Sequence, residues 1–152
     1  VQEAQSVHIT GELRSFNNKR GEGAKLVITV FARGIVFDGG EDINRVALSG
    51  TLCKAPNLRR TPLGRDICDL MLAVNRQYNK SDYIPAIAWG RNAVYAATLA
   101  VGEKIFAEGR LQSREYRKYS DDGIAEIRTA YEVSIGRLER VEYTKSSRSN
   151  TL

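Results

Sequence analysis

The stretch LAVNRQYNKSDYIPAIAWGRN, residues 72–92, interleaves large aromatic side chains with basic ones. Its rings are Tyr78, Tyr83 and Trp89, and its cations are Arg76, Lys80 and Arg91. Apolar residues alternate on both sides of a polar NKSD segment, which predicts two strands joined by a turn. Two interpretations follow from this pattern. The rings could face a hydrophobic core, or they could form a platform on which flat, negatively charged polymers stack.

The same alternation continues on both sides of this stretch and predicts an all-β domain. The expected strands cover residues 43–52, 67–78, 83–89, 104–116 and 127–141. The Ala-rich segment 91–102 ends in glycine and favours a short helix, and 118–126 favours a flexible polar loop. Five strands with one helix between the third and the fourth is the order of a five-stranded OB-fold barrel.

Glycine and proline positions refine this reading. Gly50 predicts a bend or bulge in the first strand, and a Pro-Leu-Gly turn interrupts residues 57–66. Pro85 cannot donate to a strand ladder, so its strand is expected at an edge or with a bulge. We expect Gly50, Pro62, Gly64 and Gly109 to fix turns and bends rather than to contact a ligand.

The first 42 residues repeat part of the barrel. VHITGELRSF aligns with IFAEGRLQSR when Gly11 is set against Gly109, so residues 7–37 resemble the last two strands of a second OB-fold. The predicted organisation is a partial OB-like β-hairpin at 1–42, a complete OB domain at 43–143 and a flexible tail at 144–152. Half a barrel cannot cover its own apolar face, so the hairpin should dock on the complete barrel or pair with another copy. Since the chain begins with Val, we expect a fragment cut inside an upstream OB domain, with a family-specific extension as the alternative.

Composition excludes several classes of function. The 152 residues carry a net charge of +5, and no apolar run approaches the ~20 residues of a membrane span. Cys53 and Cys68 lack CxxC spacing, and His8 is the sole histidine, with no triad pattern around it. With no phosphate-loop motif either, we expect a non-enzymatic cytoplasmic protein with reduced thiols, without membrane association, cofactor or metal.

The charge is unevenly distributed. Residues 1–42 contain five Lys and Arg against six Asp and Glu, whereas 43–143 contain sixteen against twelve. A modest basic surplus around aromatic strands fits the binding of single-stranded nucleic acid, because bases stack on rings while cations meet phosphates. The alternative is structural, since Tyr and Trp commonly fill cores with one polar end in water.

Residues 43–143 resemble the bacterial single-stranded DNA-binding protein family over essentially its whole OB domain. The resemblance lies in VALSGTLCKAPNLRRTPLGRDICDLMLAVNR, YIPAIAWGRNA and VGEKIFAEGRLQSREY. They contain the family's G-x-L-x-x-x-P-x-x-R-x-T-P-x-G opening, its L-A-V-N-R strand and its E-G-R-L strand, in order. The resemblance implies sequence-tolerant binding and protection of single-stranded DNA in replication, recombination and repair. It also implies a homo-oligomer, dimer or tetramer, associated with the bacterial nucleoid.

The resemblance also nominates DNA-binding residues. Its base-stacking aromatics match Tyr78, Tyr83, Trp89 and Tyr116, and its basic positions match or neighbour Arg59, Arg76 and Arg91. Strand placement and charge alone add Lys54, Arg110, Arg114 and Arg117. Tyr95 and Phe106 are assigned to core or subunit packing.

Two departures from the family pattern bear on partners. The chain ends SSRSNTL rather than in the family's acidic, hydrophobic tip, which places the recruitment of replication or repair proteins in doubt. The upstream half-barrel places the common tetramer in doubt. Two other functions stay open: an accessory factor like primosomal replication protein N, and a structural OB module that mediates protein assembly.

Overall fold

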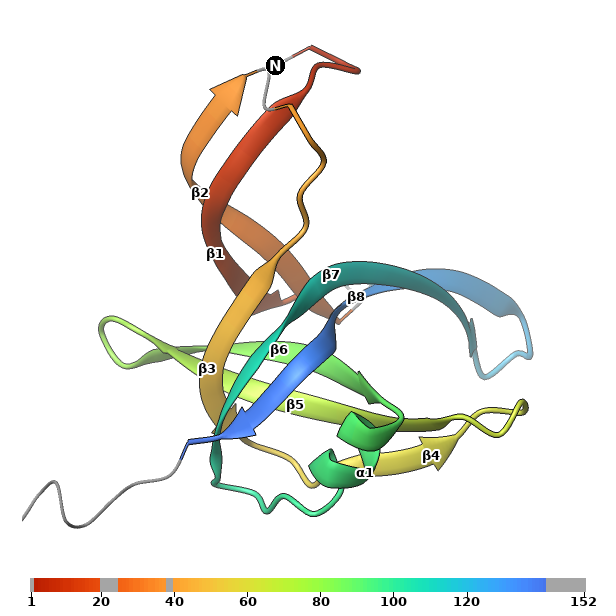
Figure 1. Ribbon diagram of the computed structural model, residues 1–152. Helices are drawn as coiled ribbons and strands as arrows, with labels where there is room; N and C mark the ends of the chain where they lie inside the picture. The colour runs from red at the N-terminus through yellow and green to blue at the C-terminus, as the bar shows by residue number, and fades with distance from the viewer. Residues whose placement is uncertain (1, 20–24, 38–39, 142–152) are drawn as a thin grey trace, which may run out of the picture.

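The computed structural model describes residues 2–19, 25–37 and 40–141, so the predicted tail at 144–152 lies outside the described part of the chain. A two-stranded sheet of β1 (Val7–Asn17) and β2 (Leu26–Phe37) precedes a six-stranded sheet ordered β3-β7-β8-β6-β5-β4 (Figure 1). The strands of the second sheet are β3 (Val46–Leu52), β4 (Asn57–Arg60), β5 (Asp66–Arg76), β6 (Lys80–Trp89), β7 (Lys104–Tyr119) and β8 (Ala125–Arg140). The helix α1 (Arg91–Ala96) lies between β6 and β7 in the chain.

The six-stranded sheet closes on itself into a barrel. β3 pairs with β7 along most of its length, and its last residues, Thr51 and Leu52, pair with β5. A parallel pairing of Ala86 and Ile87 with β8 joins the two halves of the sheet, β3-β7-β8 and β6-β5-β4, at its middle. The prediction of a five-stranded OB-fold barrel with one short helix, preceded by a strand hairpin, is therefore confirmed.

Alternating strand residues build the barrel core. Leu52, Leu72, Ile84, Ile105 and Val133 are fully buried, and each contributes about 1.5–3 kcal/mol to folding. From α1, Ala93 and Ala96 join the same cluster. Cys68 lies in this core, where burial raises the pKa of its thiol. Cys53 and Cys68 are both free thiols in the structure. Within the described residues, no helix is long and apolar enough to cross a membrane.

Two predicted segments have different bounds in the structure. The helix expected over 91–102 ends at Ala96, because the N–H groups of Thr98 and Leu99 bond carbonyls three residues back and tighten the chain into turns. The loop expected over 118–126 is mostly strand. β7 runs to Tyr119 and β8 starts at Ala125, forming a two-stranded arm that extends beyond the barrel (Figure 1). Its polar residues suited a loop, but both faces of such an arm are solvated.

The β5–β6 connection also differs from its prediction. The turn lies at 77–79 rather than at NKSD, and Tyr78 and Asn79 both adopt left-handed backbone conformations there. Ser81 and Asp82 therefore belong to β6. β6 carries no bulge and lies between β5 and β8 in the strand order, so the edge strand expected from Pro85 holds only locally, where Pro85 pairs with β5 alone. Pro85 sits one residue before the pairing with β8 begins, so this ladder does not need its missing N–H.

The N-terminal hairpin shares a backbone irregularity with the last two barrel strands. The register of β1 with β2 shifts between Thr10 and Gly11, and that of β7 with β8 shifts between Glu108 and Gly109. The aligned glycines thus occupy equivalent bulges. At both positions a methyl group would overlap a carbonyl oxygen of the partner strand, so only glycine fits without adjustment.

The hairpin lies against the barrel. Leu13 and Ile28 pack on the barrel core, and β1 contacts β6. Of the two expected arrangements, the structure shows docking on the barrel. Ser15 is the fully buried residue of β1, and it faces Asp82 and Tyr83 on β6.

Candidate nucleic-acid interface

One outer face of the six-stranded sheet gathers aromatic and basic side chains. On β6, Ile84, Ala86 and Ala88 point into the core, so the alternate residues Tyr83 and Trp89 point outward. Cross-strand register extends this face over β4, β5, β8 and β7. We call this surface the ring face, and the predicted site residues on it are Arg59, Tyr83, Trp89, Arg110, Arg114 and Tyr116.

Trp89 occupies the middle of the ring face and is held by its neighbours. Its indole Nε1 donates to Ser134 Oγ at 3.2 Å, which fixes the edge of the ring. The guanidinium carbon of Arg65 lies 4.8 Å from the ring centroid, within cation–π range. Ile67, opposite Trp89 on β5, is buried beside it. The half-buried indole is thus oriented before any ligand arrives.

Arg59 stands next to this tryptophan on the sheet. It pairs with Ile67, which in turn pairs with Trp89, so all three share one face. Its Nε and one terminal nitrogen donate to the two oxygens of Asp69 at 2.7 and 3.3 Å. That hydrogen bond raises the pKa of Arg59, so the guanidinium stays charged and has a fixed direction.

Tyr116 forms a second aromatic position, on β7. The guanidinium carbon of Arg114 lies 5.9 Å from its ring centroid. Arg114 Nε donates at 3.0 Å to Glu132, a buried carboxylate that also accepts from Gln112 at 3.1 Å. Exposed Arg110 follows on the same side of β7, opposite Ser134. Cations therefore flank this ring as they flank Trp89.

Tyr83 lies at the end of the ring face nearest the hairpin. Its side chain is 46% exposed, whereas its backbone N–H is bonded to Ser15 of β1. A series of outward-facing rings, Tyr83 exposed and Trp89 and Tyr116 half-buried, therefore runs from β7 across β6 toward the N-terminal hairpin. Bases could stack along it while their phosphates meet the arginines.

The other predicted site residues lie elsewhere. Arg76 is on the core side of β5, where its Nε is 3.0 Å from Asp82 Oδ2. Tyr78 is 89% exposed at the β5–β6 turn. Lys54 is in the connection between β3 and β4, Arg91 begins α1, and Arg117 points away from Tyr116 on the opposite side of the β7–β8 arm.

Two arginines of the ring face were not predicted from sequence. The Arg65 guanidinium lies within cation–π range of the Trp89 ring, and Arg128 lies opposite Tyr116 in the strand register. Strand pairing could have identified Arg65, since Ile67 faces Trp89 across the sheet. A flexible loop over residues 118–126 implies no register between β7 and β8 there, so the sequence does not place Arg128 opposite Tyr116.

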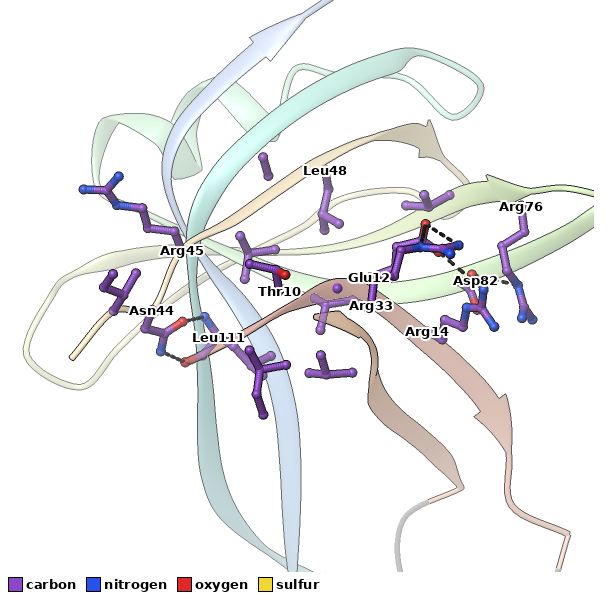
Figure 2. A pocket seen from close by; sticks show the side chains of 18 of the residues that line it. Thr10, Glu12, Arg14, Arg33, Asn44, Arg45, Leu48, Arg76, Asp82 and Leu111 are labelled. Atoms are coloured by element: carbon purple, nitrogen blue, oxygen red, sulfur yellow. Dashed lines mark hydrogen bonds and ion pairs between the residues drawn. The ribbon is translucent and has the colours of Figure 1, made fainter. Parts of the chain in front are cut away.

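A cavity of about 1340 Å³ separates the N-terminal half of β1 from the barrel (Figure 2). Its lining includes Arg14, Arg33, Arg76 and Asp82, together with apolar residues of β1 and β3. Figure 2 shows Arg76 of β5 reaching Asp82 of β6 on the barrel side of this junction. No cluster of metal-ligating side chains occurs among the residues that the structure describes.

Barrel topology and ring face together define an OB-fold protein with aromatic and basic side chains gathered on one outer sheet face. Residues 43–141 match the model of the single-strand binding protein family, about two thirds of the chain, and the chain belongs to that family. The resemblance found in the sequence motifs is thus confirmed. Family members of this kind are non-enzymatic DNA-binding proteins, which agrees with the expectation that the protein is not an enzyme.

Relatives show how much of a family member the chain represents. It is 35% identical over 97 residues to the single-stranded DNA-binding protein of Clostridium tetani, covering 55% of this chain and 67% of that protein. It is 40% identical over 81 residues to single-stranded DNA-binding protein A of Bacillus subtilis, covering 49% and 47%. The chain therefore spans between about half and two thirds of these curated relatives.

A solved structure resembles more of the chain. The single-stranded DNA binding protein from Thermus aquaticus superposes with a TM-score of 0.76 and 27% identity, over 95% of this chain and 63% of that one. A deletion mutant of the same protein gives a TM-score of 0.77. Because residues 43–141 are only about two thirds of the chain, this superposition includes the N-terminal hairpin as well as the barrel.

Proposed function

We propose that the protein binds single-stranded DNA with little sequence preference through the ring face. The carrying observation is the geometry around Trp89, whose edge is fixed by Ser134 and whose face is approached by Arg65. Such a ring offers a base a stacking surface at little ordering cost. Each stacked base contributes about 1–3 kcal/mol regardless of its identity, which gives affinity without sequence readout.

The biological role follows from that binding mode. Coating exposed strands suppresses reannealing and shields them from nucleases during replication, recombination and repair. We place this role in the bacterial cytoplasm, with a homo-oligomer letting one strand contact several barrels. Tyr78, Arg76, Lys54, Arg91 and Arg117 lie off the ring face, and Tyr78, Lys54, Arg91 and Arg117 are exposed positions along which a longer strand could continue.

The two alternative functions differ in what they require of the rings. A structural OB module would cover them in a subunit interface, and an accessory factor like primosomal replication protein N would combine DNA contact with contacts to replication proteins. Tyr83 and Tyr78 are exposed in the single chain, where a DNA strand or a second subunit could reach them, so the titration below decides between these functions. Recruitment of replication or repair proteins stays a prediction.

The test is a titration of fluorescently labelled oligo-dT, read by anisotropy, with a duplex of equal length as the control. We expect tight binding to the single strand and at least tenfold weaker binding to the duplex at the same salt. The logarithm of the association constant should fall with the logarithm of salt, with a slope of about −0.7 per phosphate contact. Equal affinity for both DNAs, or a flat salt dependence, would reject the proposed function.

A further inference from the structure

The N-terminal hairpin meets the barrel through a small polar contact that we call the clasp, made of Ser15, Arg76, Asp82 and the backbone of Tyr83. The backbone N–H of Ser15 donates to Asp82 Oδ1 at 2.9 Å. In return, the backbone N–H of Tyr83 donates to Ser15 Oγ at 2.7 Å. Arg76 Nε lies 3.0 Å from the second carboxylate oxygen of Asp82. One serine therefore contacts two consecutive residues of β6.

The clasp is closed to solvent. Asp82 is 1% exposed and Ser15 is 8% exposed, and Leu13 packs on the barrel core beside them. A buried carboxylate is tolerated when its oxygens are paired, and here one oxygen meets the hairpin and the other meets Arg76. The pairing of Asp82 therefore depends on the hairpin being docked.

Tyr83 occupies a part of β6 that has a strand ladder on one side. β5 pairs with it through Ala73, whereas β8 reaches β6 only at Ala86 and Ile87. In place of β8, the hydroxyl of Ser15 satisfies the N–H of Tyr83. Without the hairpin, this end of β6 would lose that bond and open more readily than the barrel core. The Tyr83 ring, on the ring face, would lose its fixed position with it.

The clasp also changes the role of Arg76. The family resemblance suggested that this residue lies on the DNA path, but its guanidinium is on the core side of β5 and paired with buried Asp82. Because its Nε is committed to this buried pair, we expect Arg76 to serve the hairpin contact rather than a phosphate. In the clasp, Arg76 orients the carboxylate of Asp82. Asp82 accepts the hydrogen bond from the Ser15 N–H, and the Ser15 hydroxyl accepts the one from the Tyr83 N–H.

We infer that Ser15, through the clasp with Asp82 and Arg76, is a positioning residue for Tyr83, so that hairpin docking completes the single-strand binding surface of the barrel. This inference rests on the proposed function of the ring face. It gives the hairpin a role in DNA binding without direct contact between the hairpin and DNA.

The test is a double-mutant cycle on oligo-dT affinity with Ser15→Ala and Tyr83→Ala. Ser15→Ala alone should weaken binding about 2- to 10-fold, the effect of one hydrogen bond. In the Tyr83→Ala background it should have no further effect, because the ring that it positions is gone. Phe16→Ala is the matched control, since that neighbouring side chain is exposed on the opposite face of the hairpin, and it should bind as the parent does.

Salt dependence separates positioning from phosphate contact. Ser15→Ala and Arg76→Ala should lower affinity while leaving the slope of log K against log salt at its parent value. A slope that falls by about 0.7 with Arg76→Ala would mark a phosphate contact and overturn the inference for Arg76.

The outcomes distinguish this inference from the proposed function. A parent chain that binds, with Ser15→Ala binding equally well or losing the same factor in the Tyr83→Ala background, overturns the inference alone. A parent chain that fails to bind overturns the proposed function and the inference with it. Hydrogen exchange of the 80–84 amides, faster in Ser15→Ala than in Phe16→Ala, would show that the clasp holds this end of β6.

Discussion

The two hairpins β1–β2 and β7–β8 have the same backbone plan and very different surroundings. Each is a long antiparallel pair with a register shift at an aligned glycine, Gly11 or Gly109. In the barrel, β8 buries Val133, Ile135 and Leu138. In the N-terminal hairpin, large apolar side chains remain exposed: Ile9, Phe16, Val30, Phe31, Ile35, Val36 and Phe37. A strand pair of this sequence type builds a core only where further strands close around it.

The difference extends to the polar surfaces. Tyr116 of the barrel lies near Arg114 on a face that continues to Trp89 and Tyr83. Phe31 of the hairpin is covered by Arg14, whose guanidinium carbon is 3.7 Å from its centroid, with Arg33 5.4 Å away. Glu12 pairs with both of these arginines. The hairpin therefore has an aromatic-basic cluster of its own, but it lies off the ring face, and we expect it to contribute little to DNA contact.

The largest expected effect comes from filling the two glycine bulges. Gly109→Ala would drive a methyl group into the carbonyl of Ser134, within a strand pair that closes the barrel. We expect it to lower the free energy of unfolding by about 3 kcal/mol, as overpacking does. Gly11→Ala makes the same clash with Phe31 in the hairpin, but it should shift barrel unfolding by less than about 0.5 kcal/mol.

Urea unfolding followed by Trp89 emission measures both variants on the same barrel probe. If Gly11→Ala destabilises the barrel as much as Gly109→Ala does, the hairpin and the barrel fold as one cooperative unit. The contrast between a closed and a docked strand pair would then be wrong.

The sequence predicted the architecture well because strand alternation and glycine placement are local signals. The alignment of Gly11 with Gly109 located two equivalent bulges before any register was known. The helix end at Ala96 and the β7–β8 arm were missed, because each depends on a pairing or a turn that the residues themselves do not encode. Polar residues such as Ser120 and Asp121 are as frequent in an exposed arm as in a loop.

A smaller effect is expected from removing one ring of each hairpin. Tyr116→Ala should weaken oligo-dT binding by about 2 kcal/mol, roughly 30-fold, because one stacking position is lost. Phe31→Ala should leave affinity unchanged, since its ring belongs to the N-terminal hairpin and lies off the ring face. Anisotropy titrations at one salt concentration give both values, with Tyr95→Ala on α1 as an exposed aromatic control. An equal loss for Phe31→Ala would place DNA on the hairpin.

The smallest effect concerns single charges. Arg110→Ala should reduce the salt slope of binding by about 0.7, because an exposed arginine on the ring face that has no ion-pair partner among the described residues is free to meet a phosphate. Arg33→Ala should leave the slope unchanged, since its guanidinium bonds Glu12. The test is the slope of log K against log salt, obtained from titrations at four salt concentrations. Identical slopes in the two variants would show that Arg110 does not contact a phosphate.

The candidate site was predicted in part, for a physical reason. Trp89, Tyr83 and Tyr116 share a face, and this follows from alternation once strand order is known. Arg76 and Asp82 are diagonal neighbours on β5 and β6, but the contact of Asp82 with Ser15 depends on the N-terminal hairpin that docks beside them. Contacts between segments distant in sequence are set by the tertiary arrangement, and a motif match cannot distinguish a buried ion pair from a phosphate contact.

Trp89 provides the most direct measurement of the central claim, that the ring face binds single-stranded DNA. It is the single tryptophan of the chain, so intrinsic emission reports this face and not the hairpin. We expect oligo-dT to quench this emission in proportion to the bound fraction that anisotropy measures. A duplex of equal length should quench it far less. Unchanged Trp89 emission across a titration in which anisotropy shows saturating binding would contradict the account.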